Sequence, residues 1–152
     1  MPEFDTDTFL ALPLTARVAT NGPTVRPTWY LWEDGSFWIL SGPWAKLLGR
    51  IETDPVLAIT VDLCDITDGS VRQVTARGRA DVVPFDVPRG VRLLRRYLGP
   101  DETLWDDRFR HYLHEDPMES GTVWIRLDPS SLNAVDLSYQ VSEVDDEAAG
   151  DA

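Results

Sequence analysis

The residue with the clearest potential for binding chemistry is Lys46, the single lysine among the 14 basic residues of the chain. It follows an apolar strand pattern and stands in the opening turn of a predicted helix. A helix start favours anions, because its first backbone N–H groups are free and the helix dipole is positive there. An ammonium group on a flexible stem can reach over a phosphate bound at such a place. The pattern therefore indicates a phosphate site, although an ordinary surface lysine fits it as well.

Other basic residues could extend this site. Arg50 lies one helical turn after Lys46, so both side chains can point toward one ligand or toward water. A later predicted helix carries four arginines, and we favour a solvated face paired with acidic residues over binding of an anionic cofactor tail or substrate. These are Arg89, Arg92, Arg95 and Arg96.

Most other catalytic signatures are missing from the sequence. No glycine-rich dinucleotide or Walker pattern follows a strand, and no Ser-His-Asp or Cys-His arrangement is visible. His111 and His114 lie beside Glu115, but no third cluster of ligands accompanies them, so we interpret them as structural and expect no metal site. Cys64 is the single cysteine, which excludes an internal disulfide, and its place at a strand end favours an inert residue. The catalytic residues stay unknown at this stage.

Composition limits the class of protein. The chain has 152 residues and a net charge of −12. We expect one domain over residues 1–140 and an acidic, disordered tail over 141–152. The acidic balance argues against nucleic acid as a partner. No apolar run could span a bilayer and no secretion signal is apparent, so we expect no membrane partner and a cytoplasmic protein that acts on a small molecule.

The first half of the chain is predicted to consist mainly of strands joined by turns. The turn Glu33–Ser36 separates two arms of a hairpin, and Pro27 in the first arm implies an edge, a bulge or a ligand-facing stretch. A helix opens at Pro43, with Ser41 or Gly42 as its cap. Its apolar face would consist of Trp44, Leu47, Leu48 and Ile51. The predicted elements are a short helix within Asp7–Leu14, strands Ala16–Thr20, Thr24–Trp32 and Phe37–Leu40, this helix, and a strand Val56–Val61.

The second half continues with strands interrupted by helices. A long strand, Val71–Val83, contains Gly78, which suggests a bulge or the close approach of another group. Hairpin-connected strands dominate the order, so we predict a mostly β fold, a small antiparallel barrel with peripheral helices. The remaining elements are helices from Pro88 to Leu98 and from Glu102 to Glu115, and strands Thr122–Leu127 and Leu132–Tyr139.

Aromatic residues crowd the hairpin and the helix that follows it. Alternation along the strand places Tyr30 and Trp32 on one face and Trp29 and Leu31 on the other. One set should belong to the core. The other would form an exposed aromatic patch unless a ring-shaped ligand or a second subunit covers it.

Several short segments, in this order and spacing, resemble the pyridoxamine 5′-phosphate oxidase-like superfamily, and more narrowly its flavin- and deazaflavin-dependent reductases. The resemblance covers roughly residues 13–137 and implies the FMN-binding split β-barrel fold. Its segments are Pro27–Gly35, Phe37–Pro43, Lys46 with Ile51, Asp54–Val61, Val74–Val83 and Val123–Pro129.

The resemblance also implies a site and a partner. Members of this superfamily are homodimers that hold the cofactor between subunits. Ser41 and Lys46 match the residues that contact the cofactor phosphate in this superfamily. The family's strand that lies along the flavin ring corresponds in this sequence to Arg26, Pro27, Thr28 and Trp29. Ala45 and Gly49 depart from the family pattern, where polar residues are common, and this removes two polar contacts to the cofactor.

The resemblance implies a flavin- or deazaflavin-dependent oxidoreductase that transfers a hydride between its cofactor and a small organic substrate. FMN is the first candidate. The deazaflavin coenzyme F-420 is the second. Its acidic tail would require extra arginines, and Arg50 and the arginines of the predicted helix from Pro88 to Leu98 could provide them. Two alternatives stay open: a non-catalytic protein that stores or senses flavin or haem, and a cofactor-free dimer with a structural role.

Overall fold

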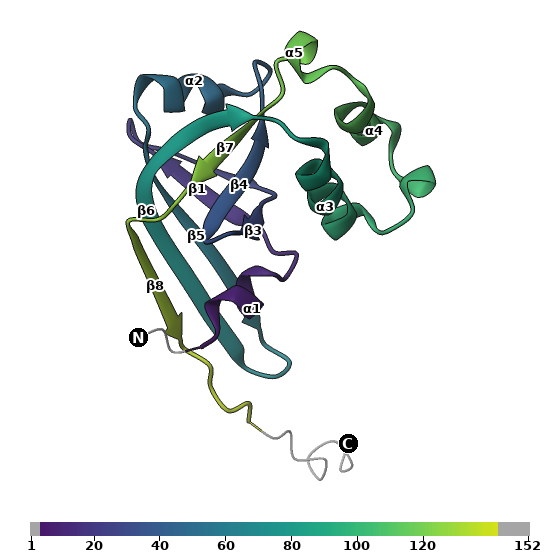
Figure 1. Cartoon of the computed structure of the whole chain (residues 1–152). Helices are drawn as coiled ribbons and strands as arrows, with labels where there is room; N and C mark the ends of the chain where they lie inside the picture. Colours follow the sequence, from purple (N-terminus) through teal and green to yellow (C-terminus); the bar gives the residue numbers. More distant parts are fainter. Residues whose placement is uncertain (1–3, 143–152) are drawn as a thin grey trace, which may run out of the picture.

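The computed structural model describes residues 4–142, and its centre is an antiparallel sheet that curves into a split barrel (Figure 1). The strands follow the order β2-β1-β5-β6-β7-β4-β3, and β8 pairs with β6 outside this path. The mostly β, antiparallel fold predicted from the sequence is therefore confirmed. The strands are β1 Ala16–Thr20, β2 Thr24–Thr28, β3 Leu31–Glu33, β4 Ser36–Ser41, β5 Val56–Asp65, β6 Ser70–Pro84, β7 Val123–Leu127 and β8 Ser131–Asp136.

Strand β6 links the two halves of the barrel because it changes partners along its length. Its first part pairs with β5 and β8, and its last part, from Ala80 on, pairs with β7. Gly78 stands just before this change. A side chain there would approach the Leu127 side chain and the backbone of Ser130. The glycine thus serves a close approach rather than a bulge, and β6 continues through it.

The strand predicted over Thr24–Trp32 is in fact two strands, β2 and β3. They lie at opposite ends of the strand order, and Trp29 and Tyr30 carry the chain between them. The turn Asp34–Gly35 then closes the β3–β4 hairpin, and both of its residues have positive φ (53° and 69°), as a tight hairpin turn requires.

Helices pack around the barrel at two main places (Figure 1). The helix α2 covers one end, with Leu47 and Ile51 buried in the barrel core. A second cluster lies outside β4 and β7, where Leu93 of α3 packs with Trp38 and Trp124. The helices are α1 Thr6–Leu10, α2 Lys46–Thr53, α3 Val87–Leu98, α4 Asp107–His114 and α5 Pro117–Ser120, with a 3-10 turn at Glu102–Leu104.

One helix prediction in the second half of the chain needs correction. The helix predicted over Glu102–Glu115 is broken at Trp105, a buried residue that follows the 3-10 turn and precedes α4 along the chain, and a short α5 follows α4. Within residues 4–142, no helix has the length and apolar character needed to cross a membrane. Most of the predicted acidic tail, residues 143–152, lies outside the described residues.

Candidate functional site

The candidate site begins where β4 ends, at Ser41. Ser41 is paired with Val123 of β7, and only 1% of its surface is exposed. Its hydroxyl oxygen is buried, yet no group within residues 4–142 forms a hydrogen bond with it. A buried hydroxyl without a partner is unfavourable, so this atom is suited to a ligand that supplies the missing hydrogen bond.

The next feature is the start of α2, which lies later than predicted. A turn closed by the bond from the Ala45 N–H to the Gly42 carbonyl (3.0 Å) precedes the helix, and α2 begins at Lys46 rather than at Pro43. Neither Ser41 nor Gly42 is its cap. The N-cap is Ala45, which makes no side-chain capping bond. The first backbone N–H groups of α2 are therefore free of any side-chain acceptor, which favours an anion.

Trp44 also differs from its predicted place. It precedes α2 and is 52% exposed, so it is not part of the buried face formed by Leu47 and Ile51. Its ring folds back over the α-carbon of Gly42, where a side chain would collide with it. Trp44 thus stands as an exposed aromatic wall beside Ser41 and Lys46.

These residues line one cavity of about 350 Å³. Four of the seven residues predicted to bind the cofactor, Arg26, Thr28, Ser41 and Lys46, lie around it. Arg26 and Lys46 are both exposed, and within residues 4–142 neither side chain takes part in an ion pair or a hydrogen bond. The other lining residues are Ile39, Leu40, Trp44, Ala45 and Leu47.

Arg50 lines a neighbouring cavity of about 400 Å³, which shares Lys46 with the first. Across it, the Asn21 amide donates to the Asp54 carboxylate (2.8 Å), and this bond lowers the pKa of Asp54. The other two residues predicted to bind the cofactor, Pro27 and Trp29, line neither of these two cavities. Pro27 is exposed on the edge strand β2, opposite Arg17 of β1.

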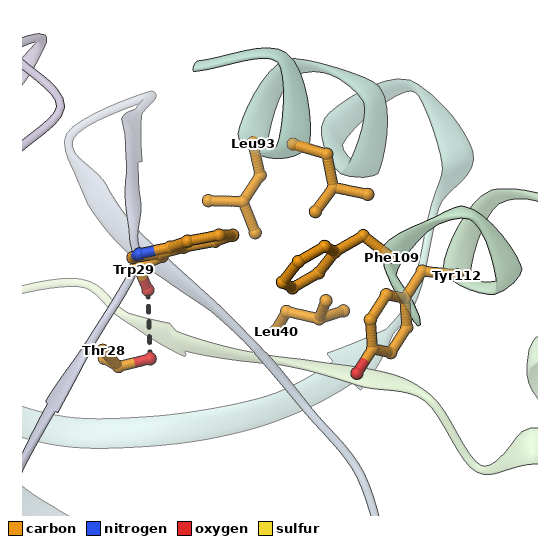
Figure 2. Close-up of a pocket in the computed structure, with 7 residues that line it drawn as sticks. Thr28, Trp29, Leu40, Leu93, Phe109 and Tyr112 are labelled. Atoms are coloured by element: carbon orange, nitrogen blue, oxygen red, sulfur yellow. Dashed lines mark hydrogen bonds between the residues drawn. The ribbon is translucent and has the colours of Figure 1, made fainter. Parts of the chain in front are cut away.

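Trp29 contributes to a separate, mostly apolar pocket of about 280 Å³ (Figure 2). Its ring stacks on Tyr97 of α3, with centroids 4.7 Å apart, and on Phe109 of α4 at 5.3 Å. The predicted aromatic patch at Trp29 is thus already covered by helices of the same chain. The pocket is lined by Thr28, Trp29, Leu40, Leu93, Leu94, Phe109 and Tyr112.

The apolar pocket and the Ser41–Lys46 cavity are neighbours. Thr28 and Leu40 line both of them, and the rings of Trp44 and Tyr112 meet at 5.7 Å. Leu93 and Tyr112 were not predicted to line a pocket. Their spacing along the helices is typical of an apolar helix face, and this pattern does not distinguish a core residue from one that lines a pocket.

The arginines of α3 mostly bind groups of their own chain. Arg89 forms ion pairs with Glu33, Asp34 and Asp86 at 3.1–3.4 Å. Arg92 also pairs with Glu33, while Arg96 donates to the carbonyls of Leu10 and Leu12. The prediction that the arginines of this helix pair with acidic residues is confirmed for Arg89 and Arg92.

The two histidines are not brought together with acidic residues into a cluster. His114 pairs with Glu102, and His111 lies against the ring of Tyr112. Within residues 4–142, no group of three or more histidine, cysteine, aspartate or glutamate side chains is arranged to hold a metal ion.

Comparison with known proteins identifies the fold. No protein-family model and no curated protein matches the sequence. Among solved structures, a conserved hypothetical protein of Mycobacterium tuberculosis, Rv2991, is 22% identical, with a TM-score of 0.71 over 95% of this chain and 93% of the other.

Two further similar structures belong to proteins named for a cofactor or a reaction. One is an F420 reductase, 22% identical with a TM-score of 0.61 over 87% of this chain and 98% of the other. The other is the flavocytochrome Anf3 of Azotobacter vinelandii, 18% identical with a TM-score of 0.64 over 99% of this chain and 75% of the other. The chain therefore shares the split-barrel fold of these structures, which is the fold that the sequence resemblance implies.

Proposed function

We propose that this split-barrel chain is an oxidoreductase that binds a phosphorylated flavin-type cofactor in the Ser41–Lys46 cavity. FMN is the first candidate and the deazaflavin F-420 the second. The fold is shared with an F420 reductase and with an FAD binding protein of Mycobacterium smegmatis, which supports a cofactor of this class.

The observation that carries the proposal is the buried hydroxyl of Ser41, which has no hydrogen-bond partner within residues 4–142, beside the unpaired ammonium of Lys46 and a helix start without a side-chain cap. A phosphate would satisfy all three. It accepts a hydrogen bond from Ser41, a charge-assisted bond from Lys46 and backbone bonds from the first turn of α2. Arg26 adds a second positive charge at the rim of the cavity.

A bound flavin supplies hydride chemistry, so the chain itself needs no nucleophile or acid–base pair. The residues of the chain then bind the cofactor and exclude water from its site. Ser41, Lys46 and Arg26 fix the phosphate, and the strand end at Thr28 leads from there toward the apolar pocket. A small organic substrate would enter beside it.

A homodimer would complete this site. Val25 is 68% exposed beside Arg26 on the edge strand, and Trp44 is 52% exposed beside Lys46. Large apolar side chains exposed at the rim of a cavity favour coverage by a second subunit. The proposal therefore places the cofactor between two copies of the chain.

The α3 arginines favour FMN over the deazaflavin. The acidic tail of the deazaflavin would need several free arginines, yet Arg89, Arg92 and Arg96 are committed to their own chain. Besides Lys46, the basic residues that line the phosphate cavity or its neighbour are Arg26 and Arg50.

The test is a titration of the purified protein with FMN and with F-420, followed by visible absorbance. Lys46→Ala should weaken FMN binding by about 10- to 150-fold, the loss of a charge-assisted hydrogen bond of about 1.5–3 kcal/mol. Arg95→Ala is the matched control, because it removes an exposed arginine of α3 that lies outside the cavity. Equal FMN affinity in the wild type and Lys46→Ala would refute the assigned site.

Turnover separates the enzyme from its alternatives. Reduction of the bound flavin followed by reoxidation with an organic acceptor is the expected result. Bound pigment without such turnover would favour a protein that stores or senses its cofactor. A protein that takes up none of FMN, F-420 or haem would favour the structural dimer.

A further inference from the structure

The apolar pocket beside Trp29 has a composition that the phosphate site does not explain. Its lining contains no charged side chain, and its walls are the rings of Trp29 and Phe109 together with leucines of α3 and β4 (Figure 2). A volume of about 280 Å³ is close to the lower limit for small-molecule sites. Such a space suits one or two fused rings and excludes a charged ligand, which would lose its hydration without gaining a partner.

Two polar groups belong to this lining, and they differ in availability. The hydroxyl of Thr28 already donates to the carbonyl of Trp29 at 3.3 Å. The hydroxyl of Tyr112 forms no hydrogen bond with any group of residues 4–142. Figure 2 shows the Tyr112 ring extending from α4 past Phe109, with the hydroxyl at its far end.

The phenol of Tyr112 is protonated at neutral pH, as that of an ordinary tyrosine is, and its surroundings favour this form further. Burial raises the pKa of its phenol, and the nearby carboxylate of Glu115 raises it further. The group therefore stays protonated at neutral pH and offers one O–H donor to a ligand.

We propose that this pocket is the substrate site and that it takes an uncharged, planar molecule whose one hydrogen-bond acceptor is met by the Tyr112 hydroxyl. The inference rests on the proposed function, because the substrate must lie beside the cofactor. Thr28 and Leu40 line both cavities, so a molecule in the pocket is adjacent to a ligand that occupies the Ser41–Lys46 cavity.

The test uses three probes that share the naphthalene ring: 2-acetylnaphthalene with a neutral acceptor, naphthalene with none, and 2-naphthoate with a charge. Binding to the full chain without cofactor is followed by quenching of tryptophan fluorescence, since Trp29 lines the pocket. We expect 2-acetylnaphthalene to bind about 2- to 10-fold more tightly than naphthalene, because its acetyl oxygen accepts one hydrogen bond from Tyr112. The charged 2-naphthoate should bind most weakly. Equal affinities of the first two probes would overturn the proposal, as would preferred binding of the charged probe.

Variants assign the effect to Tyr112. Tyr112→Phe keeps the ring, so it should retain the fold, abolish the advantage of 2-acetylnaphthalene and leave naphthalene binding unchanged. Tyr139→Phe, which removes the hydroxyl of an exposed tyrosine outside the pocket, is the matched control. An advantage that survives in Tyr112→Phe would contradict the role given to the hydroxyl.

Failure of the substrate site and failure of the cofactor site are distinguishable. Lys46→Ala should leave the binding of 2-acetylnaphthalene unchanged while it weakens FMN. If 2-acetylnaphthalene binds as expected but FMN does not, the cofactor assignment is wrong and the pocket stands. If FMN binds but the probes do not discriminate, the substrate site is wrong and the cofactor assignment stands.

Discussion

The indole of Trp29 lies parallel to the ring of Tyr97, with centroids 4.7 Å apart and an angle of 3° between their planes. The hydroxyl of the same Tyr97 donates to the carbonyl of Leu14 (2.6 Å) and accepts from the backbone N–H of Tyr30 (3.2 Å). One side chain of α3 therefore holds both the ring and the backbone at the point where β2 gives way to β3. This break positions Thr28 and Trp29 at the junction of the two cavities.

Tyr97→Phe should destabilise the fold while it preserves the ring contact with Trp29. The substitution leaves the Leu14 carbonyl and the Tyr30 N–H without their partner, and a loss of this kind lowers the free energy of unfolding by about 1–3 kcal/mol. Urea denaturation followed by circular dichroism measures it. A loss of less than about 0.5 kcal/mol would contradict the bridging role, because that is the range of ordinary surface substitutions.

Alkaline pH should weaken the same region through Tyr30. Burial raises the pKa of Tyr30 to about 12, from an ordinary value near 10, and burial also raises the pKa of Tyr97. Between the two values the unfolded chain loses its phenolic proton first. The stabilisation is therefore complete below pH 10 and is lost as the pH rises toward 12.

The prediction is a free energy of unfolding that falls between pH 10 and 12 by up to about 1.4 kcal/mol per pH unit for Tyr30. Tyr30→Phe should reduce this slope, whereas Tyr139→Phe, at an exposed tyrosine, should leave it unchanged. Urea denaturation at stepped pH gives the slopes directly. Identical slopes in the wild type and Tyr30→Phe would contradict the assignment.

Local patterns predicted much of the fold and part of the candidate cavity. The strand Ala16–Thr20 and the segment of the candidate cavity from Ser41 to Lys46 depend on alternation, turn residues and helix-start chemistry, all of which act over a few residues. The break at Trp29 was not predictable in this way. It depends on Tyr97, which lies 67 positions away from Tyr30. The cover of Trp29 by α3 and α4 is equally a result of tertiary packing.

The true start of α2 was missed for a similar reason. Pro43 has the backbone geometry of a first helical position, so the sequence favours a helix there. In the structure a turn at Gly42–Ala45 intervenes, with the ring of Trp44 against Gly42. This packing delays the helix to Lys46 and leaves Ala45, a residue without a capping group, at its N-cap.

Arg89 should be a structural residue rather than a ligand of an anion. Its guanidinium lies 3.9 Å from the centroid of the Trp38 ring and pairs with three carboxylates, and 25% of its side chain is exposed. Arg89→Met removes the charge and leaves Asp34 and Asp86 without this ion-pair partner, while Glu33 keeps its pair with Arg92. The free energy of unfolding should therefore fall by about 1–2 kcal/mol.

Arg95→Met provides the matched control, because Arg95 is an exposed arginine of the same helix. It should change the free energy of unfolding by less than about 0.5 kcal/mol. Both variants should bind FMN as the wild type does. If Arg89→Met left the free energy of unfolding unchanged but weakened FMN binding, Arg89 would be a ligand of the cofactor rather than a structural residue.

Ser41→Ala should have opposite effects on stability and on binding. The Ser41 hydroxyl is buried and has no hydrogen-bond partner within residues 4–142, so its removal should leave the free energy of unfolding of the cofactor-free protein unchanged or raise it by up to about 1 kcal/mol. In the presence of FMN the same hydroxyl would donate to the charged phosphate, and its loss should weaken binding by about 10- to 150-fold. Thermal unfolding with and without FMN measures both effects in one experiment. A variant that is less stable without FMN, yet binds it normally, would show that Ser41 supports the fold at the end of β4 and contributes nothing to the cofactor.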